Sequence, residues 1–140
     1  MAVDIHGKWQ KRNKNSENWQ DINGNFKWFH GNRNRELFFF LNDFRNPATD
    51  DIEKELMLVL SEENYPDTPF PYNKIKDLNA EGYNFWGAGY LTLDELYDLM
   101  NNMSDNDYRK DSLESFVREI EMYVNDDNDA EYRAIFVFDN

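Results

Sequence analysis

The sequence contains no cysteine among its 140 residues, and it has only six glycines and four prolines. Without cysteine, disulfides, thiolate metal sites and a cysteine nucleophile are excluded. Neither a phosphate-binding glycine loop followed by lysine nor a Gly-x-Ser-x-Gly nucleophile turn is present. The pattern therefore favours a protein that is not an enzyme, and we predict no catalytic residue, no metal and no cofactor.

Long hydrophobic runs are also missing. The longest apolar runs, at 37–41 and 56–60, are far shorter than the roughly 20 residues that a membrane-spanning helix needs. The first residues lack the basic and apolar pattern of a secretory signal. We therefore expect a soluble, cytoplasmic protein with no membrane partner. Its length suits a single domain over residues 1–140.

Positive charge is scarce and unevenly placed. The chain has 15 Lys and Arg against 28 Asp and Glu, a net charge of −13. Residues 46–140 hold seven basic and 23 acidic side chains, which is −16, so the first 45 residues carry +3. Such a field repels nucleic acid and attracts basic protein surfaces. We predict a protein partner and no nucleic acid, although acidic residues on a surface also simply promote solubility.

Apolar periodicity predicts an α+β fold. Alternation near the amino terminus predicts a meander of three short strands, at 3–9, 19–22 and 26–29. Asn23-Gly24 would form the turn between the last two strands. Residues 132–138 are apolar on both alternating faces except at Arg133, which is typical of a central strand covered on each side. We predict that the meander and this carboxy-terminal strand form one small mixed or antiparallel sheet.

Three to four helices are predicted to pack on that sheet. Apolar spacing and capping residues place their starts near residues 35, 50, 93 and 112, although 56–60 could equally be a buried strand. The third begins at a capping box in which Thr92 and Glu95 satisfy each other's backbone N–H groups. Proline and glycine interrupt every period between 61 and 90, so a long irregular connection is expected there.

Several segments carry a resemblance to a known group of proteins. They are Asp4-Ile5-His6, residues 31–38 continuing to Leu41 and Arg45-Asn46, residues 91–96, and Val137-Phe138-Asp139-Asn140. Together they resemble a family of uncharacterised small proteins encoded by bacteriophages and prophages, in the same order along the chain. The resemblance implies a phage origin and a place in the host cytosol, and it implies no activity.

Aromatic residues of the 61–90 connection are the first candidates for binding. The connection contains seven aromatic side chains, and we expect some of them to stay exposed, because irregular structure does not bury so many rings. Tyr83, Trp86 and Tyr90 are the candidates. Tryptophan and tyrosine in a polar rim are typical anchors of protein interfaces. The alternative is that these rings fold back on the helices as a lid.

Three charged residues complete the candidate partner-binding set. Arg35 and Arg45 flank the phenylalanine-rich helix, where they either serve the helix ends or clamp a carboxylate of a partner. His6 lies on the first strand, and pairing of the two chain ends would bring it close to Asp139.

The sequence thus predicts an accessory protein that acts by binding, as an acidic inhibitor of a host protein such as a defence factor. One alternative is a DNA mimic, which requires carboxylates spaced along one elongated face. Another is a small-ligand binder or enzyme that uses His6, Arg35 and the Trp86 loop, which requires these residues to converge in one concave site. The identity of the partner and the oligomeric state stay open.

Overall fold

The structure is a computed structural model that describes residues 3–26, 35–63, 74–124 and 129–140. Its strands are β1 (Asp4–Asn13), β2 (Gln20–Asn25), β3 (Asn46–Pro47), β4 (Phe85–Thr92) and β5 (Ala130–Asp139). Its helices are α1 (Arg35–Phe44), α2 (Asp50–Glu62), α3 (Ile75–Ala80), α4 (Leu93–Asn101) and α5 (Tyr108–Glu121).

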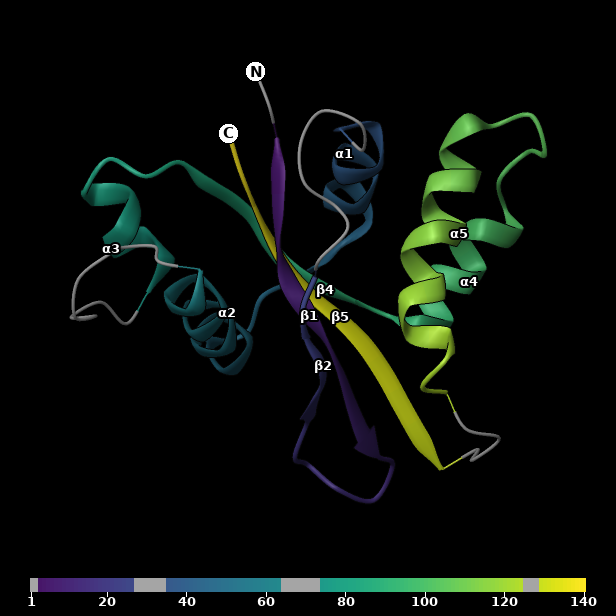
Figure 1. Ribbon diagram of the computed structural model, residues 1–140, viewed down its shortest axis with the longest axis horizontal. Helices are drawn as coiled ribbons and strands as arrows, with labels where there is room; N and C mark the ends of the chain where they lie inside the picture. Colours follow the sequence, from purple (N-terminus) through teal and green to yellow (C-terminus); the bar gives the residue numbers. More distant parts are fainter. Residues whose placement is uncertain (1–2, 27–34, 64–73, 125–128) are drawn as a thin grey trace.

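The strands form one antiparallel sheet in the order β2-β1-β5-β4-β3. Helices cover both faces of this sheet (Figure 1). Helices α1, α4 and α5 lie on one side, here called the α1 face, and α2 and α3 lie on the other, the α2 face. The predicted α+β class, with a sheet built from the amino-terminal strands and the carboxy-terminal strand, is confirmed.

The central strand is β5, and it pairs with β1 along its whole length, from Asp4↔Asp139 to Asn13↔Ala130. Its side chains alternate between the faces, as the pleat of a strand requires. Phe136 and Phe138 enter the α1-face core, while Ile135 and Val137 enter the α2-face core, and all four are fully buried. The predicted central strand is therefore confirmed.

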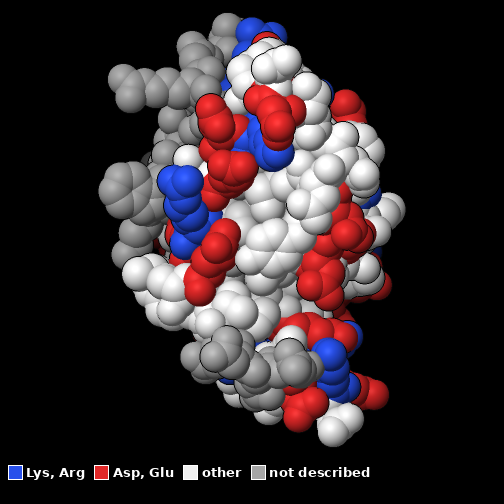
Figure 2. Space-filling view, turned by 90° about the vertical axis from the view of Figure 1, so that its right-hand side faces the viewer, with Lys and Arg blue, Asp and Glu red and all other residues white. Residues whose placement is uncertain are grey.

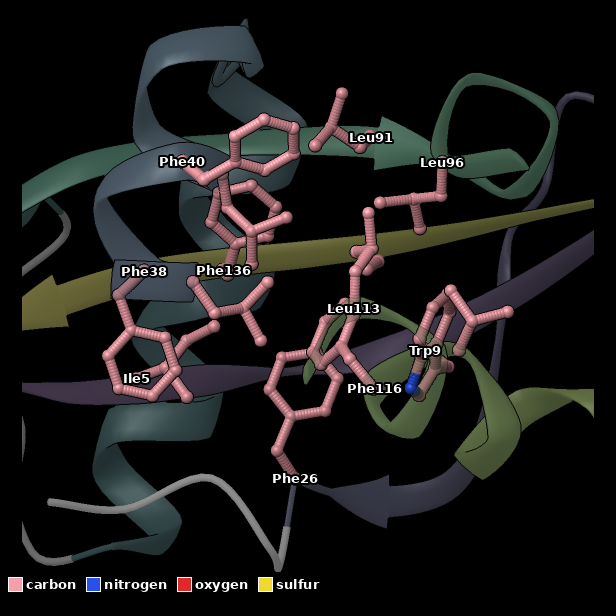
Figure 3. Close-up of a cluster of buried hydrophobic side chains, with 14 of the residues drawn as sticks. Ile5, Trp9, Phe26, Phe38, Phe40, Leu91, Leu96, Leu113, Phe116 and Phe136 are labelled. Atoms are coloured by element: carbon pink, nitrogen blue, oxygen red, sulfur yellow. The ribbon is translucent and has the colours of Figure 1, made fainter. Parts of the chain in front are cut away.

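Aromatic side chains dominate the α1-face core. The rings of Trp9, Phe26 and Phe116 lie within 6.1 Å of one another, centroid to centroid (Figure 3). Phe38 of α1 packs against Phe138 of β5 at 5.7 Å. Offset and edge-to-face aromatic pairs of this kind add about 0.5–1.5 kcal/mol each beyond the burial of their area.

The amino-terminal meander differs from the prediction. β1 is one unbroken strand, and Asn23-Gly24 lies inside β2 rather than in a turn. Both residues have positive φ, 60° and 71°, at the point where the β1–β2 register shifts, so they form a bulge. Of the third predicted strand, at 26–29, only Phe26 is described, and its N–H donates to the carbonyl of Gly7. The rest lies outside the described residues.

Three of the four predicted helix starts, near residues 35, 50 and 93, agree with the structure, and capping bonds are present at two of them. Both bonds of the capping box between Thr92 and Glu95 are present at 3.1 Å. The hydroxyl of Thr49 caps α2, and so the predicted second helix is confirmed. The fourth helix begins earlier than predicted, because Asp107 rather than Asp111 accepts the first free N–H.

The irregular connection predicted over 61–90 is wrong where the chain is described. Helix α3 and strand β4 lie within it. The side-chain amide of Asn79 bonds both the N–H and the carbonyl of Phe85, at 2.8 and 2.9 Å, and so joins the end of α3 to the start of β4. Gly87 interrupts the local pattern, yet pairing with β5 keeps the strand intact on both sides of it.

Gly87 is the residue that makes this strand possible. Its φ is +68°, where the register between β4 and β5 shifts, and a Cβ atom there would lie 2.5 Å from Asn42 Oδ1 and 2.7 Å from Phe138 Cδ2. Only glycine accepts both the left-handed backbone and this close approach. The bulge reverses which face of the sheet the following residues occupy.

We expect Gly87→Ala to lower the free energy of unfolding by about 2–4 kcal/mol, from left-handed strain together with overpacking. The matched control is Gly24→Ala, whose φ of +71° brings the same strain but whose Cβ would meet nothing within 4 Å. That control should cost about 1–2 kcal/mol. Urea unfolding of both variants measures the difference, and equal losses would contradict the close packing at Gly87.

Candidate functional site

The predicted aromatic anchors do not form one patch. Trp86 lies on the α1 face against Phe138, whereas Tyr83 and Tyr90 pack with the α2-face core. The bulge at Gly87 separates Trp86 from Tyr90 and places them on opposite faces. All three side chains are partly buried against a core cluster rather than fully exposed, and their role in partner binding stays a prediction.

Trp86 and Arg35 are connected through Phe39. The rings of Phe39 and Trp86 stack with centroids 5.6 Å apart, and the guanidinium of Arg35 lies 5.4 Å from the centre of the Phe39 ring. The indole N–H of Trp86 donates to Asn140 Oδ1 at 3.0 Å. Sequence reasoning missed Phe39, although it lies off the apolar stripe of its helix, which is the signal of an exposed ring.

His6 is held between two carboxylates. Its Nδ1 bonds Glu63 and its Nε2 bonds Asp139 Oδ2 at 2.6 Å, so the proximity of His6 to Asp139 expected from strand pairing is present. Burial by itself lowers the pKa of His6, but the two hydrogen-bonded carboxylates outweigh it and raise the pKa to about 9. At neutral pH both ring nitrogens therefore carry protons, and an imidazolium neither binds a metal ion nor accepts a proton.

His6 begins a buried polar stripe along the α2 face of the sheet. Lys8 Nζ donates to Asp21 and Glu55, each at 2.8 Å. Further along, Arg133 donates to Gln10 Oε1 at 2.9 Å. Glu55 and Glu63, the partners of Lys8 and His6, come from α2 and the residue after it. Two cations of the sheet, His6 and Lys8, thus meet carboxylates of and beside the helix that covers them.

Arg133 is the cation of this stripe whose pKa is lowered by burial. Its guanidinium lies 3.9 Å from the centre of the Trp19 ring. The guanidinium of Arg12 lies 4.5 Å from the centre of the same ring. Burial and the nearby charge of Arg12 lower the pKa of Arg133 to about 10. Stacking on an indole is a favourable environment for a guanidinium that has lost part of its hydration.

The ligand-binding or enzyme alternative required His6, Arg35 and Trp86 to converge. The sheet separates His6 from the other two, because the His6 ring contacts the α2 side while Trp86 packs on the α1 face with Phe39 between it and Arg35. Of the three cavities identified among the described residues, none is lined by any of the three. Within the described ranges, no group of three His, Asp or Glu side chains is placed to hold a metal ion.

Arg45 and Asn46 tie α1 to the bulge of β4. Arg45 donates to the backbone and side-chain oxygens of Asn42, at 2.7 and 2.9 Å, and to the carbonyl of Ala88 at 3.3 Å. Asn46 Nδ2 lies 3.0 Å from both carboxylate oxygens of Glu95. These contacts join the end of α1 to β4 and α4, and they occupy Arg45 within the fold.

A small cavity opens beside this junction. It has a volume of about 220 Å³, and it is lined by Phe44, Leu91, Glu95, Asp98, Leu99 and Asn102. We call it the Phe44 socket. Its four residues from α4 and the C-cap recur at helical spacing, on a side of α4 away from the buried stripe. Leu99 lies off that stripe, and this position was the signal in the sequence that could have indicated the socket. Sequence reasoning did not use it.

No family model matches the chain, and no curated protein or solved structure matches it either. In the part of the chain that the structure describes, every helix is too short or too polar to cross a membrane. The assignment of function therefore rests on the geometry and the charges of the chain itself.

The His6 clamp makes a prediction about pH. Because the pKa of His6 rises from 6.5 to about 9 on folding, its stabilisation is fully present below pH 6.5 and is lost as the pH rises through about 9. We expect the free energy of unfolding of the wild type to exceed that of His6→Gln by up to about 3 kcal/mol near pH 6. Near pH 10 the difference should be much smaller.

Urea unfolding of both proteins at the two pH values measures this difference. Glu63→Gln should also destabilise near pH 6, whereas Glu62→Gln, which changes the exposed carboxylate next to it, should have little effect. A gap between wild type and His6→Gln that does not change with pH would contradict a charged His6.

Trp86 is expected to contribute to the stability of the fold, whereas an exposed anchor on a loop would contribute little. Trp86→Ala removes contacts with Phe138 and Phe39 and the bond to Asn140, so it should cost about 2 kcal/mol. Tyr108→Ala, at a side chain that is 66% exposed, is the control and should change stability by less than about 0.5 kcal/mol. A negligible loss for Trp86→Ala would restore the loop interpretation.

Proposed function

We propose that this is an accessory protein that binds a basic surface of a partner protein through the side formed by α4 and α5. From Leu93 to Glu121 the chain has nine Asp and Glu against three Lys and Arg, a net charge of −6. Two of the three cations are already paired nearby, Arg109 with Asp107 at 2.7 Å and Lys110 with Asp105 at 3.0 Å. This uncompensated excess of carboxylates is the observation that supports the proposal.

The arrangement of these charges suits a protein partner. Figure 2 shows this side, where acidic side chains gather in groups around a broad uncharged area. Exposed apolar side chains accompany them, among them Tyr108 at the start of α5. Charges of one sign steer a basic partner into contact, and apolar side chains provide burial once contact is made.

The resemblance to phage proteins suggests a host protein as the partner. An acidic protein that covers a basic functional surface would inhibit its owner, which fits an inhibitor of a host defence factor. The DNA-mimic alternative needs an elongated row of carboxylates. Lys and Arg side chains lie within the acidic groups in Figure 2, so the arrangement favours recognition of a protein surface over imitation of a phosphate backbone.

The test is capture from host lysate followed by affinity measurement with the purified captured protein. We expect a basic partner whose affinity falls as salt rises, because surface charge attraction is screened. A variant of the α4–α5 side should bind about tenfold more weakly, which is about 1.4 kcal/mol spread over three charges. Its substitutions are Asp94→Asn, Asp111→Asn and Glu121→Gln.

The control variant removes three exposed carboxylates elsewhere, by Glu17→Gln, Glu62→Gln and Glu81→Gln. Its affinity should stay within about twofold of wild type. Equal weakening by both variants, or a captured partner with an acidic or apolar surface, would refute the proposed surface. We also expect no measurable binding of duplex DNA at physiological salt, since the charge opposes it.

A further inference from the structure

We propose that the Phe44 socket receives one arginine side chain of the basic partner. This inference rests on the proposed function and names the group that is recognised. The socket lies where the end of α1, the end of β4 and the helix α4 meet, and each of these elements supplies part of its lining.

The size of the socket selects a single side chain. Its volume of about 220 Å³ is below the roughly 300–1,000 Å³ of pockets that enclose small-molecule ligands. Leu91 is fully buried and Leu99 partly buried, so apolar atoms line the interior. The ring of Phe44 is 52% exposed, which leaves much of its surface open to a partner. A long aliphatic stem would bury this apolar surface.

Two carboxylates give the socket its charge preference. Glu95 is fixed, because it accepts hydrogen bonds from Asn46 and from the N–H of Thr92. Asp98 follows one turn later and is exposed, and among the ion pairs of the described residues none involves it. An apolar occupant would leave these carboxylates partly desolvated without a counter-charge, which is costly.

The end of α4 adds to the same preference. Asn102 is the C-cap of this helix, and the last turn of α4 contains no basic residue. Carbonyl groups at a helix carboxy terminus carry partial negative charge and favour a cation nearby. The negative end of the helix and the carboxylate of Asp98 therefore act on the same position.

Arginine fits this combination better than lysine. A guanidinium stacks on an aromatic ring and binds a carboxylate through two parallel bonds, whereas an ammonium group is strongly hydrated and has no flat face. The chain already uses this arrangement next door. Arg109 lies 4.9 Å from the centre of the Phe40 ring and bonds both oxygens of Asp107, and Phe40 packs on Phe44 at 4.9 Å.

The experiment uses three peptides with the intact protein. Each has a central residue flanked by two lysines on either side, and the central residue is arginine, lysine or citrulline, the neutral isostere of arginine. Binding is followed by NMR of the Leu91 and Leu99 methyl groups, which lie in the socket. We expect the arginine peptide to shift these signals and to bind about five to tenfold more tightly than the other two.

Three variants locate the effect. Asp98→Asn and Phe44→Leu should each remove most of the preference for arginine. Asp94→Asn makes the same change of charge on the same helix outside the socket, so it should preserve the preference. Thermal unfolding of each variant confirms that the fold is retained.

The outcomes separate this inference from the proposed function. Equal binding of the arginine and lysine peptides, or equal weakening by Asp98→Asn and Asp94→Asn, would overturn the socket and leave binding of a basic partner intact. Arginine preference in the peptides, without any loss of partner capture when the α4–α5 carboxylates are removed, would support the socket and refute the proposed partner surface.

Discussion

The ladder between β1 and β5 is the contact on which the rest of the structure depends. It joins residue 4 to residue 139, so closing it orders nearly the whole chain, and the cost in loop entropy is offset only by burial on both sides. Because β5 is buried on each face, its neighbours β1 and β4 and both helix layers meet on it. The fold therefore forms through long-range contacts, with local signals marking where the helices begin.

This ladder also divides the chain's charges into two populations. On the α2 face, cations of the sheet meet carboxylates of and beside α2, as Lys8 does with Glu55 and His6 with Glu63. Buried ion pairs contribute little net stability, but loss of one partner leaves an uncompensated charge, and so they specify where α2 packs. On the side of α4 and α5, local pairs neutralise few of the carboxylates, and the excess faces solvent.

The electrical asymmetry of the molecule thus arises in two stages. The sequence places most acidic residues after residue 45, and folding pairs two of them, Glu55 and Glu63, with cations of the sheet. Exposed carboxylates remain on α4 and α5 and beside the Phe44 socket, among them Asp94, Asp98 and Asp111. A field of one sign beside exposed aromatic rings is the physical basis for recognising a basic partner, and the socket gives that field a point of specific contact.

The sequence by itself determined the features that depend on near neighbours along the chain. Examples are the capping box of Thr92 and Glu95 and the two-sided apolar pattern of β5, since hydrogen bonds over three residues and a period of two are local properties. Only the tertiary structure decided that Trp86 and Tyr90 lie on opposite faces, because pairing with β5 keeps β4 a strand through the bulge at Gly87. It also decided that His6 meets a glutamate 57 residues away, because contacts between distant segments are set by packing geometry that no local pattern records.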